Sequence, residues 1–182
     1  MTVISPCDAE EAYKATLAAA AHPGPVYLRL AREKTPLMTT SETPFAIGKA
    51  VVMWESDHAP EVAVFATGPL LHNALLAAKE LEHAIPVTVI NVHTIKPLDK
   101  EAVLAAARAT GAVVTVEEHQ IAGGLGSAVA EVLAAEYPVP VEFVGVKDQF
   151  GQSGEPKELV QYYGMAPSHI VEAIRKVRSR KQ

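Results

Sequence analysis

Short apolar runs alternate with helical segments through most of the chain. After Pro44 the apolar runs cover residues 47–54, 62–67, 87–92, 113–117 and 141–146. Helical periodicity marks residues 73–83, 99–109, 125–135, 156–163 and 167–177. Strands that alternate with helices of this length need right-handed crossovers, and nearly continuous apolar strands indicate a sheet covered on both faces. We therefore predict an α/β fold, a three-layer αβα sandwich with a mostly parallel five-stranded sheet.

The first 44 residues stand apart from this pattern. Residues 9–21 predict an amphipathic helix with Asp8 as its N-cap, and residues 26–31 predict a short strand. Residues 33–44 show no periodicity and contain Thr, Ser and two prolines, which is typical of a linker. One helix and one strand cannot bury an apolar face alone. We expect residues 1–44 to be the end of an incomplete domain plus a linker, docked weakly on a complete domain of residues 45–182.

Composition disfavours several classes of protein. The net charge is −5, and the basic residues gather only in the C-terminal tail, where cations suit the end of a helix. Cys7 is the only cysteine, so an intrachain disulfide is impossible and a cysteine metal site is disfavoured. The sequence shows neither a signal-peptide pattern nor an apolar run of about 18 residues. We expect a cytoplasmic protein that binds no nucleic acid and no membrane.

Two motifs lie where α/β proteins often bind ligands. The turn Gly123-Gly124-Leu125-Gly126 opens a helix, whose amides could hold a phosphate, but close packing against a neighbouring backbone requires glycine equally and is the favoured interpretation. Glu117-Glu118-His119 ends a strand and could supply an acid–base pair or part of a metal site. Because no second motif supplies further ligands, a hydrogen-bonded structural cluster is the favoured interpretation here.

Two further segments leave their function open. The polar, glycine-rich stretch 145–154 is either an interface or ligand loop or a plain strand-to-helix connection. Arg29 and Arg32 follow the first predicted strand, and arginine binds phosphate in a bidentate manner. From the residues alone, a structural ion pair is the favoured interpretation for this pair of arginines.

Taken in order, these motifs resemble the transketolase family. The resemblance rests on Gly24 to Arg32, Thr94 to Asp99, Thr115 to His119, Gly123 to Gly126, Gly151 to Gly154, Leu159 and Tyr163-Gly164. It implies the last helix and strand of a pyrimidine-binding domain, a linker and a whole transketolase C-terminal domain. It also implies transfer of a two-carbon ketol unit between sugar phosphates in the complete enzyme.

The same resemblance limits what this chain does alone. The family holds thiamine diphosphate and Mg²⁺ with a Gly-Asp-Gly motif and activates the cofactor with a glutamate early in the pyrimidine-binding domain. The sequence contains no Gly-Asp-Gly, and we expect the chain to start after that glutamate. The resemblance therefore implies no catalytic, cofactor-binding or metal-binding residue here, and an inactive isolated chain.

The substrate site and the partners are also implied by the resemblance. Arg32 matches the family arginine that binds the substrate phosphate, and Arg29 is the second candidate, with a more structural role. The implied partners are an N-terminal transketolase half and a second copy of the chain in a homodimer. Deoxyxylulose-phosphate synthases would carry Pro-Arg-Gly at Ala31-Arg32-Glu33, and 2-oxoacid dehydrogenase β subunits usually lack both arginines. A non-catalytic dimerisation or ligand-binding module is the alternative from another class.

Overall fold

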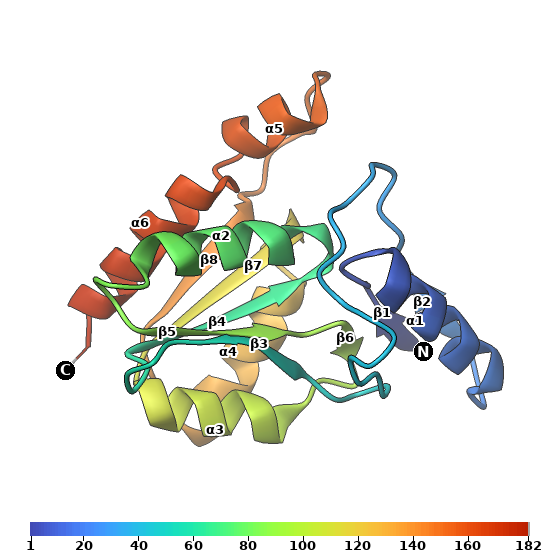
Figure 1. Cartoon of the computed structure of the whole chain (residues 1–182), viewed down its shortest axis with the longest axis horizontal. Helices are drawn as coiled ribbons and strands as arrows, with labels where there is room; N and C mark the ends of the chain where they lie inside the picture. Colours follow the sequence, from blue (N-terminus) through green and yellow to red (C-terminus); the bar gives the residue numbers. More distant parts are fainter. Residues whose placement is uncertain (182) are drawn as a thin grey trace.

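The larger of two sheets forms the centre of the fold (Figure 1). The computed structural model describes residues 1–181. The sheet has the order β3-β5-β4-β7-β8, formed by Val51–Glu55, Val87–Asn91, Val62–Thr67, Val113–Gln120 and Val141–Val146. β3 runs antiparallel to β5, and the remaining neighbours are parallel. The predicted five-stranded, mostly parallel sheet is confirmed.

Helices cover both faces of this sheet. α2 (Leu71–Leu81) and α6 (Pro167–Ser179) lie on one face, and α3 (Lys100–Thr110) and α4 (Leu125–Glu136) lie on the other (Figure 1). The short helix η1 (Gly68–Leu70) leads into α2, and α5 (Pro156–Tyr162) precedes α6. The predicted three-layer αβα sandwich is therefore confirmed. In the part of the chain that the structure describes, no helix is long and apolar enough to cross a membrane.

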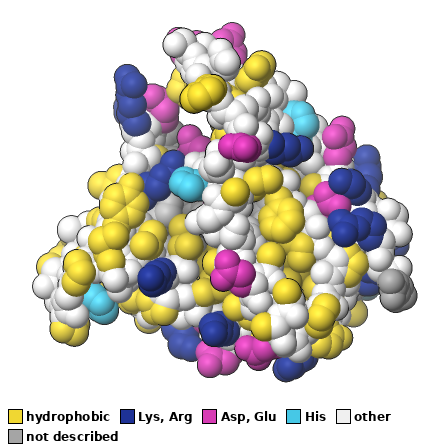
Figure 2. Space-filling view, turned by 180° about the vertical axis from the view of Figure 1, so that it is seen from behind, with side chains coloured by type: hydrophobic (Ala, Val, Ile, Leu, Met, Phe, Trp, Pro, Cys, Tyr) yellow, Lys and Arg dark blue, Asp and Glu magenta, His cyan; other side chains and the backbone are white. Residues whose placement is uncertain are grey.

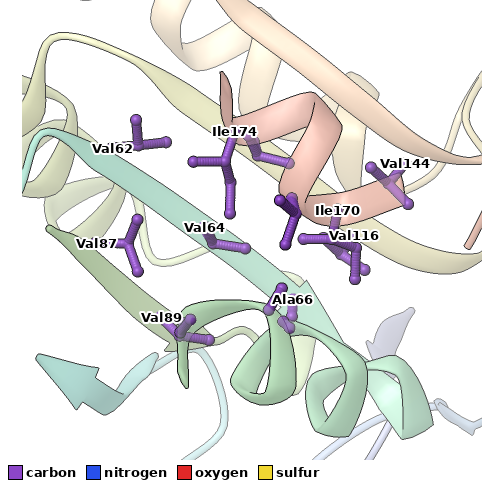
Figure 3. Close-up of a cluster of buried hydrophobic side chains, with 14 of the residues drawn as sticks. Val62, Val64, Ala66, Val87, Val89, Val116, Val144, Ile170 and Ile174 are labelled. Carbon is purple, nitrogen blue, oxygen red and sulfur yellow. The ribbon is translucent and has the colours of Figure 1, made fainter. Parts of the chain in front are cut away.

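The buried side chains of β4 show why the sheet needs both helical layers. All six residues of β4 are buried. Val62, Val64 and Ala66 pack with the α2 and α6 layer, whereas Ala63 and Phe65 pack with the α3 and α4 layer. This is the period of two expected of a strand. Figure 3 shows the first cluster, in which Ile170 and Ile174 of α6 lie near valines from β4, β7 and β8, and β5 adds Val87 and Val89.

A second, smaller sheet joins the N-terminal segment to the rest of the fold. Its order is β2-β1-β6, formed by Val26–Leu28, Thr2–Ile4 and Thr94–Lys96. β1 is parallel to β2 and antiparallel to β6. β1 and β6 were not predicted, because each depends on pairing with the other, far along the chain. β1 joins residues 1–44 to β6, and the Ser5 amide donates to the His93 carbonyl (2.8 Å). The segment therefore has a sheet to pair with, and its weak docking stays a prediction.

Asp8 ties the first helix to the linker. It caps α1 (Ala9–Ala21) by accepting from the Glu11 amide (2.9 Å), which confirms the predicted N-cap. It also accepts from the Met38 and Thr39 amides (2.6 Å each) and from the Thr39 hydroxyl (2.7 Å). Burial acts to raise the pKa of Asp8, but these hydrogen bonds outweigh it and leave the pKa below its ordinary value. The linker is thus fastened at Thr39.

Candidate functional site

A cavity of about 680 Å³ lies between the small sheet and α4. Tyr27, Val3 and Lys96 are aligned partners across the three strands and all line the cavity. Ser5 and Arg29 come two residues after Val3 and Tyr27 and line it too, as the period of a strand requires. α4 forms the opposite wall with Gly124, Ser127, Ala128, Glu131, Val132 and Ala135. Figure 2 views the molecule from behind, where hydrophobic side chains surround scattered basic and acidic ones.

Glu117 occupies the N-terminus of α4 at one end of this cavity. Its buried carboxylate accepts from the Leu125 and Gly126 amides, each at 2.8 Å. A Cβ atom on Gly124 would lie 1.9 Å from Glu117 Oε2, so this position accommodates only glycine. Burial raises the pKa of Glu117, and the two amide donors partly offset that effect. The structure therefore supports the packing interpretation of the glycine-rich turn. The amides at the start of α4 are occupied by the carboxylate of Glu117 and not by a bound phosphate.

His119 lies beside Glu117 without forming a close pair with it. The distance from His119 Nδ1 to Glu117 Oε2 is 3.8 Å, whereas Nδ1 lies 2.8 Å from the Gln120 carbonyl oxygen. A carbonyl oxygen only accepts, so Nδ1 carries a hydrogen in this arrangement. Residues 1–181 contain no group of three His, Cys, Asp or Glu side chains placed to hold a metal ion. The hydrogen-bonded cluster is the interpretation that the geometry supports.

The structure separates the two candidate arginines. Arg29 Nη2 donates to the Glu118 carbonyl at 2.8 Å, which ties the end of β2 to β7. The side chain of Arg32 is 97% exposed, its Nε lies 3.9 Å from the Glu33 carboxylate, and it is not among the residues that line the cavity. Arg29 therefore bonds to the backbone and borders the cavity, whereas Arg32 presents its guanidinium to solvent.

The glycine-rich segment after β8 is held in place by Tyr163. The Tyr163 hydroxyl donates to the Phe150 carbonyl (3.0 Å) and accepts from the Gln152 amide (2.6 Å). The Phe150 side chain itself is 93% exposed. An exposed aromatic ring on a fastened loop is compatible with either interpretation of this segment, so the interface function stays a prediction.

Sequence reasoning missed a buried polar cluster that links α1 to β5. Glu11 accepts from the Cys7 amide and from Asn91 Nδ2, each at 2.7 Å. Burial raises the pKa of both the Glu11 carboxyl and the Cys7 thiol. Glu11 and Asn91 are 80 positions apart, so the sequence gives no sign of their contact. Ser5 and Lys96 of the cavity were missed because they depend on the unpredicted strands β1 and β6.

Residues 48–170 match the model of the family described as transketolase, C-terminal domain. The chain belongs to this family. It is 43% identical over its whole length to the 6-deoxy-6-sulfo-D-fructose transketolase subunit SqwH of Clostridium sp. (strain MSTE9) and covers 56% of that protein. It is also 39% identical, over 94% of its length, to 1-deoxy-D-xylulose-5-phosphate synthase of Symbiobacterium thermophilum, of which it covers 27%.

A solved structure shows the same fold over the entire chain. It is described as a split-gene transketolase in an inactive β4 tetramer, and it superposes with a TM-score of 0.94 at 42% identity. The match covers 100% of this chain and 59% of the other. The transketolase resemblance and its implied fold are thereby confirmed, and the chain spans little more than half of these two transketolase relatives.

Proposed function

We propose that this chain is the C-terminal part of a transketolase that transfers a two-carbon ketol unit between sugar phosphates when the cofactor-binding domains complete it. The observation that carries the proposal is the likeness of the entire chain to transketolase subunits, at 43% identity in sequence and a TM-score of 0.94 in structure. In this proposal the chain works with an N-terminal transketolase half and forms a homodimer.

Thiamine diphosphate and Mg²⁺ belong, in this proposal, to the domains outside residues 1–182. The residues present do not fit the cofactor, because the amides at the N-terminus of α4 are engaged by the Glu117 carboxylate. The sequence also lacks the Gly-Asp-Gly motif that the transketolase resemblance requires. The chain would therefore contribute to substrate binding and assembly, and no chemical step is assigned to its side chains.

We propose the same division of the chain that the sequence predicted. Residues 1–44 would be the last helix and strand of the pyrimidine-binding domain with the linker, and residues 45–182 the C-terminal domain. The start of the family match at residue 48 supports this boundary. β2 has only β1 as a neighbour in the small sheet, which leaves an edge where further strands of a larger domain would pair.

Arg32 is the residue that we propose for the anionic group of the substrate. It lies on a segment fastened at both ends, since the Arg29 amide donates to the Ile4 carbonyl (2.8 Å) and the Thr39 amide donates to Asp8 (2.6 Å). The guanidinium on this segment is 97% exposed, so its donors are available to a ligand. Arginine binds phosphate oxygens in a bidentate manner.

The identity of that anionic group has two candidates. A sulfonate presents three oxygens on a tetrahedral centre, as a phosphate monoester does, and would meet the same guanidinium donors. The relative whose name specifies 6-deoxy-6-sulfo-D-fructose makes the sulfonate a second candidate for this chain. Assays with a phosphorylated and a sulfonated ketose donor, each at matched concentration, distinguish the two.

The test is Arg32→Ala in the complete enzyme, with Lys34→Ala from the same exposed segment as the matched control. Loss of a charge-assisted contact costs about 1.5–3 kcal/mol, so we expect the KM for the anionic ketose to rise about ten- to a hundredfold. The affinity for thiamine diphosphate should stay unchanged, and Lys34→Ala should match the wild type. Wild-type kinetics for Arg32→Ala would contradict the assigned role.

A further inference from the structure

The segment between β8 and α6 projects from the body of the molecule (Figure 1). Every residue from 147 to 158 is exposed, and none of the seven residues of α5 is buried. Two aromatic side chains are exposed along this segment, Phe150 and, at the end of α5, Tyr162. Aromatic side chains are enriched in protein–protein interfaces relative to the remaining surface. The segment is therefore a candidate docking surface.

Both exposed rings are held by Tyr163, whose own ring belongs to the buried core. The Tyr163 hydroxyl donates to the Phe150 carbonyl (3.0 Å) and accepts from the Gln152 amide (2.6 Å). The Tyr162 ring lies edge-on to the Tyr163 ring, with 5.0 Å between the ring centroids. A loop that is ordered before binding loses less conformational entropy when a partner covers it. Phe150 is thus presented to solvent on a backbone that is already fixed.

Charged side chains of both signs flank the two rings. Five of them are exposed along the segment: Lys147, Asp148, Glu155, Lys157 and Glu158. The ion pairs found within residues 1–181 include none of these five. An apolar centre within a polar rim is the usual composition of a surface that binds a protein. The mixed signs fit a protein partner better than a polyanion such as nucleic acid.

The position of Arg32 indicates which protein covers this surface. Arg29 donates to the Glu118 carbonyl (2.8 Å), which joins the end of β2 to the end of β7. The Ile121 amide donates to the Val146 carbonyl (3.0 Å), which joins the chain after β7 to the end of β8. The segment that carries Arg32 and the exposed aromatic loop therefore leave the same edge of the molecule.

The proposed reaction brings the N-terminal transketolase half to this edge. In that proposal a ketose has its anionic end at Arg32 and its carbonyl end at the thiamine diphosphate of the other half. That half must come within the length of one sugar phosphate of Arg32. Leu30 and Leu37, on either side of Arg32 along the chain, are exposed apolar residues too. Even a domain of 100 residues has a radius of gyration of about 13 Å, so a domain placed there also covers the aromatic loop.

We propose that the N-terminal transketolase half docks on the aromatic loop, with the Phe150 ring inserted into an apolar pocket of that half and the Tyr162 ring beside it. This inference rests on the proposed function, which supplies the partner and its position near Arg32. It goes further by giving residues 147–162 a role apart from the substrate. Phe150 holds the partner, whereas Arg32 holds the ketose.

The test is calorimetric titration with the purified N-terminal half in thiamine diphosphate and Mg²⁺, followed by ketose kinetics at a saturating concentration of each variant. Burial of a Phe ring is worth about ten- to a hundredfold in affinity. We expect Phe150→Ala to raise the Kd of the complex by that factor and to leave the KM for the ketose unchanged. Leu76→Ala, at an exposed apolar position on α2, is the matched control and should bind as the wild type does.

Three results would overturn the proposal. Equal Kd values for Phe150→Ala and Leu76→Ala would show that the ring lies outside the interface. A raised KM with an unchanged Kd would show that the ring contacts the ketose and not the partner. Both of these results leave the transketolase proposal standing, whereas a wild-type chain that forms no complex with the N-terminal half would overturn both proposals.

A second variant tests the fixed backbone of the loop. Tyr163→Phe keeps the buried ring but removes both hydrogen bonds to the loop, so we expect the Kd to rise about three- to tenfold. Tyr162→Phe loses a hydroxyl that is not part of these hydrogen bonds and should keep the wild-type Kd. Circular dichroism confirms that each variant is folded. A wild-type Kd for Tyr163→Phe would show that the ordered loop takes no part in docking and would refute the proposal.

Discussion

The contact between Glu117 and Gly124 shows how one side chain can determine the identity of another residue. A Cβ atom at position 124 would meet Glu117 Oε2 at 1.9 Å and the Gln120 carbonyl at 2.8 Å. Gly124→Ala must shift one of them, so we expect a loss of about 1–3 kcal/mol in the free energy of unfolding. Gly151→Ala is the control, because no atom lies within 4 Å of its added Cβ. Equal urea midpoints for the two variants would show that the turn adapts without cost.

His93 makes stability depend on pH. It is fully buried and stacked on Phe45, and burial lowers its pKa to about 4 from an ordinary value of 6.5. Below pH 6.5 the unfolded chain therefore takes up a proton that the folded chain excludes, so stability falls as the pH drops from 6.5 toward 4. We expect this residue to account for about 2 kcal/mol of lost stability between pH 7 and pH 5.

The check is urea unfolding of the wild type and of His93→Gln at both pH values. The wild type should lose more stability than the variant between pH 7 and pH 5, and the difference isolates His93 from the buried carboxyls. Burial raises the pKa of Glu11 and Glu117 in the folded chain. These carboxyls therefore lower the free energy of unfolding as the pH rises above their ordinary pKa, which is opposite to the effect of His93. An identical change in both proteins would contradict the account of His93.

Individual residues could be predicted where their role is local. Asp8 was recognisable as an N-cap, because capping involves an amide three residues away. The glycine-rich turn was recognisable by its position between a strand and a helix. Glu11 and Ser5 could not be found in this way, because the side chains that bond to them, Asn91 of β5 and Thr67 of β4, lie far along the chain.

At the scale of elements, the sequence predicted the helices, the strands of the larger sheet and β2, but neither β1 nor β6. β4 and the first four residues of β7 are nearly all apolar and fully buried, and such a run can be recognised in the sequence without its partners. β1 and β6 have three residues each, so their existence depends on the pairing between them. The antiparallel direction of β3 could also not be predicted from the sequence. A helical crossover makes the next strand parallel, but β3 follows a linker, which allows either direction.

The linker and α1 are coupled through Asp8, and this coupling can be tested. Asp8→Ala removes the cap of α1 and the acceptor for Met38 and Thr39, so we expect a loss of about 2–3 kcal/mol in the free energy of unfolding. Hydrogen exchange should accelerate at the amides of Met38 and Thr39. The control is Asp57→Ala, at an exposed position, which should leave both measurements unchanged. Unchanged exchange at Thr39 in Asp8→Ala would show that the linker is held by other contacts.

For the molecule as a whole, the sequence pattern changes near residue 44, but the small sheet contains strands from both sides of that boundary. β6, from the second part, completes the sheet of β1 and β2. The two buried apolar clusters nevertheless draw only Cys7 from residues 1–44 among their fully buried members. We therefore expect residues 45–182 to unfold cooperatively on their own. The family resemblance, and not these clusters, is the ground for expecting them to sediment as a dimer. A non-cooperative melting curve would show that the N-terminal segment is required for folding.

The central claim is that this chain is one part of a transketolase, and the most direct measurement is ketol transfer. The chain is assayed alone, and then combined with the protein that carries the cofactor-binding domains, in the presence of thiamine diphosphate and Mg²⁺. We predict neither cofactor binding nor turnover for the chain alone, and turnover of an anionic ketose for the combined protein. Micromolar cofactor binding by the isolated chain, or a combined protein that holds the cofactor but transfers no ketol unit, would contradict the account.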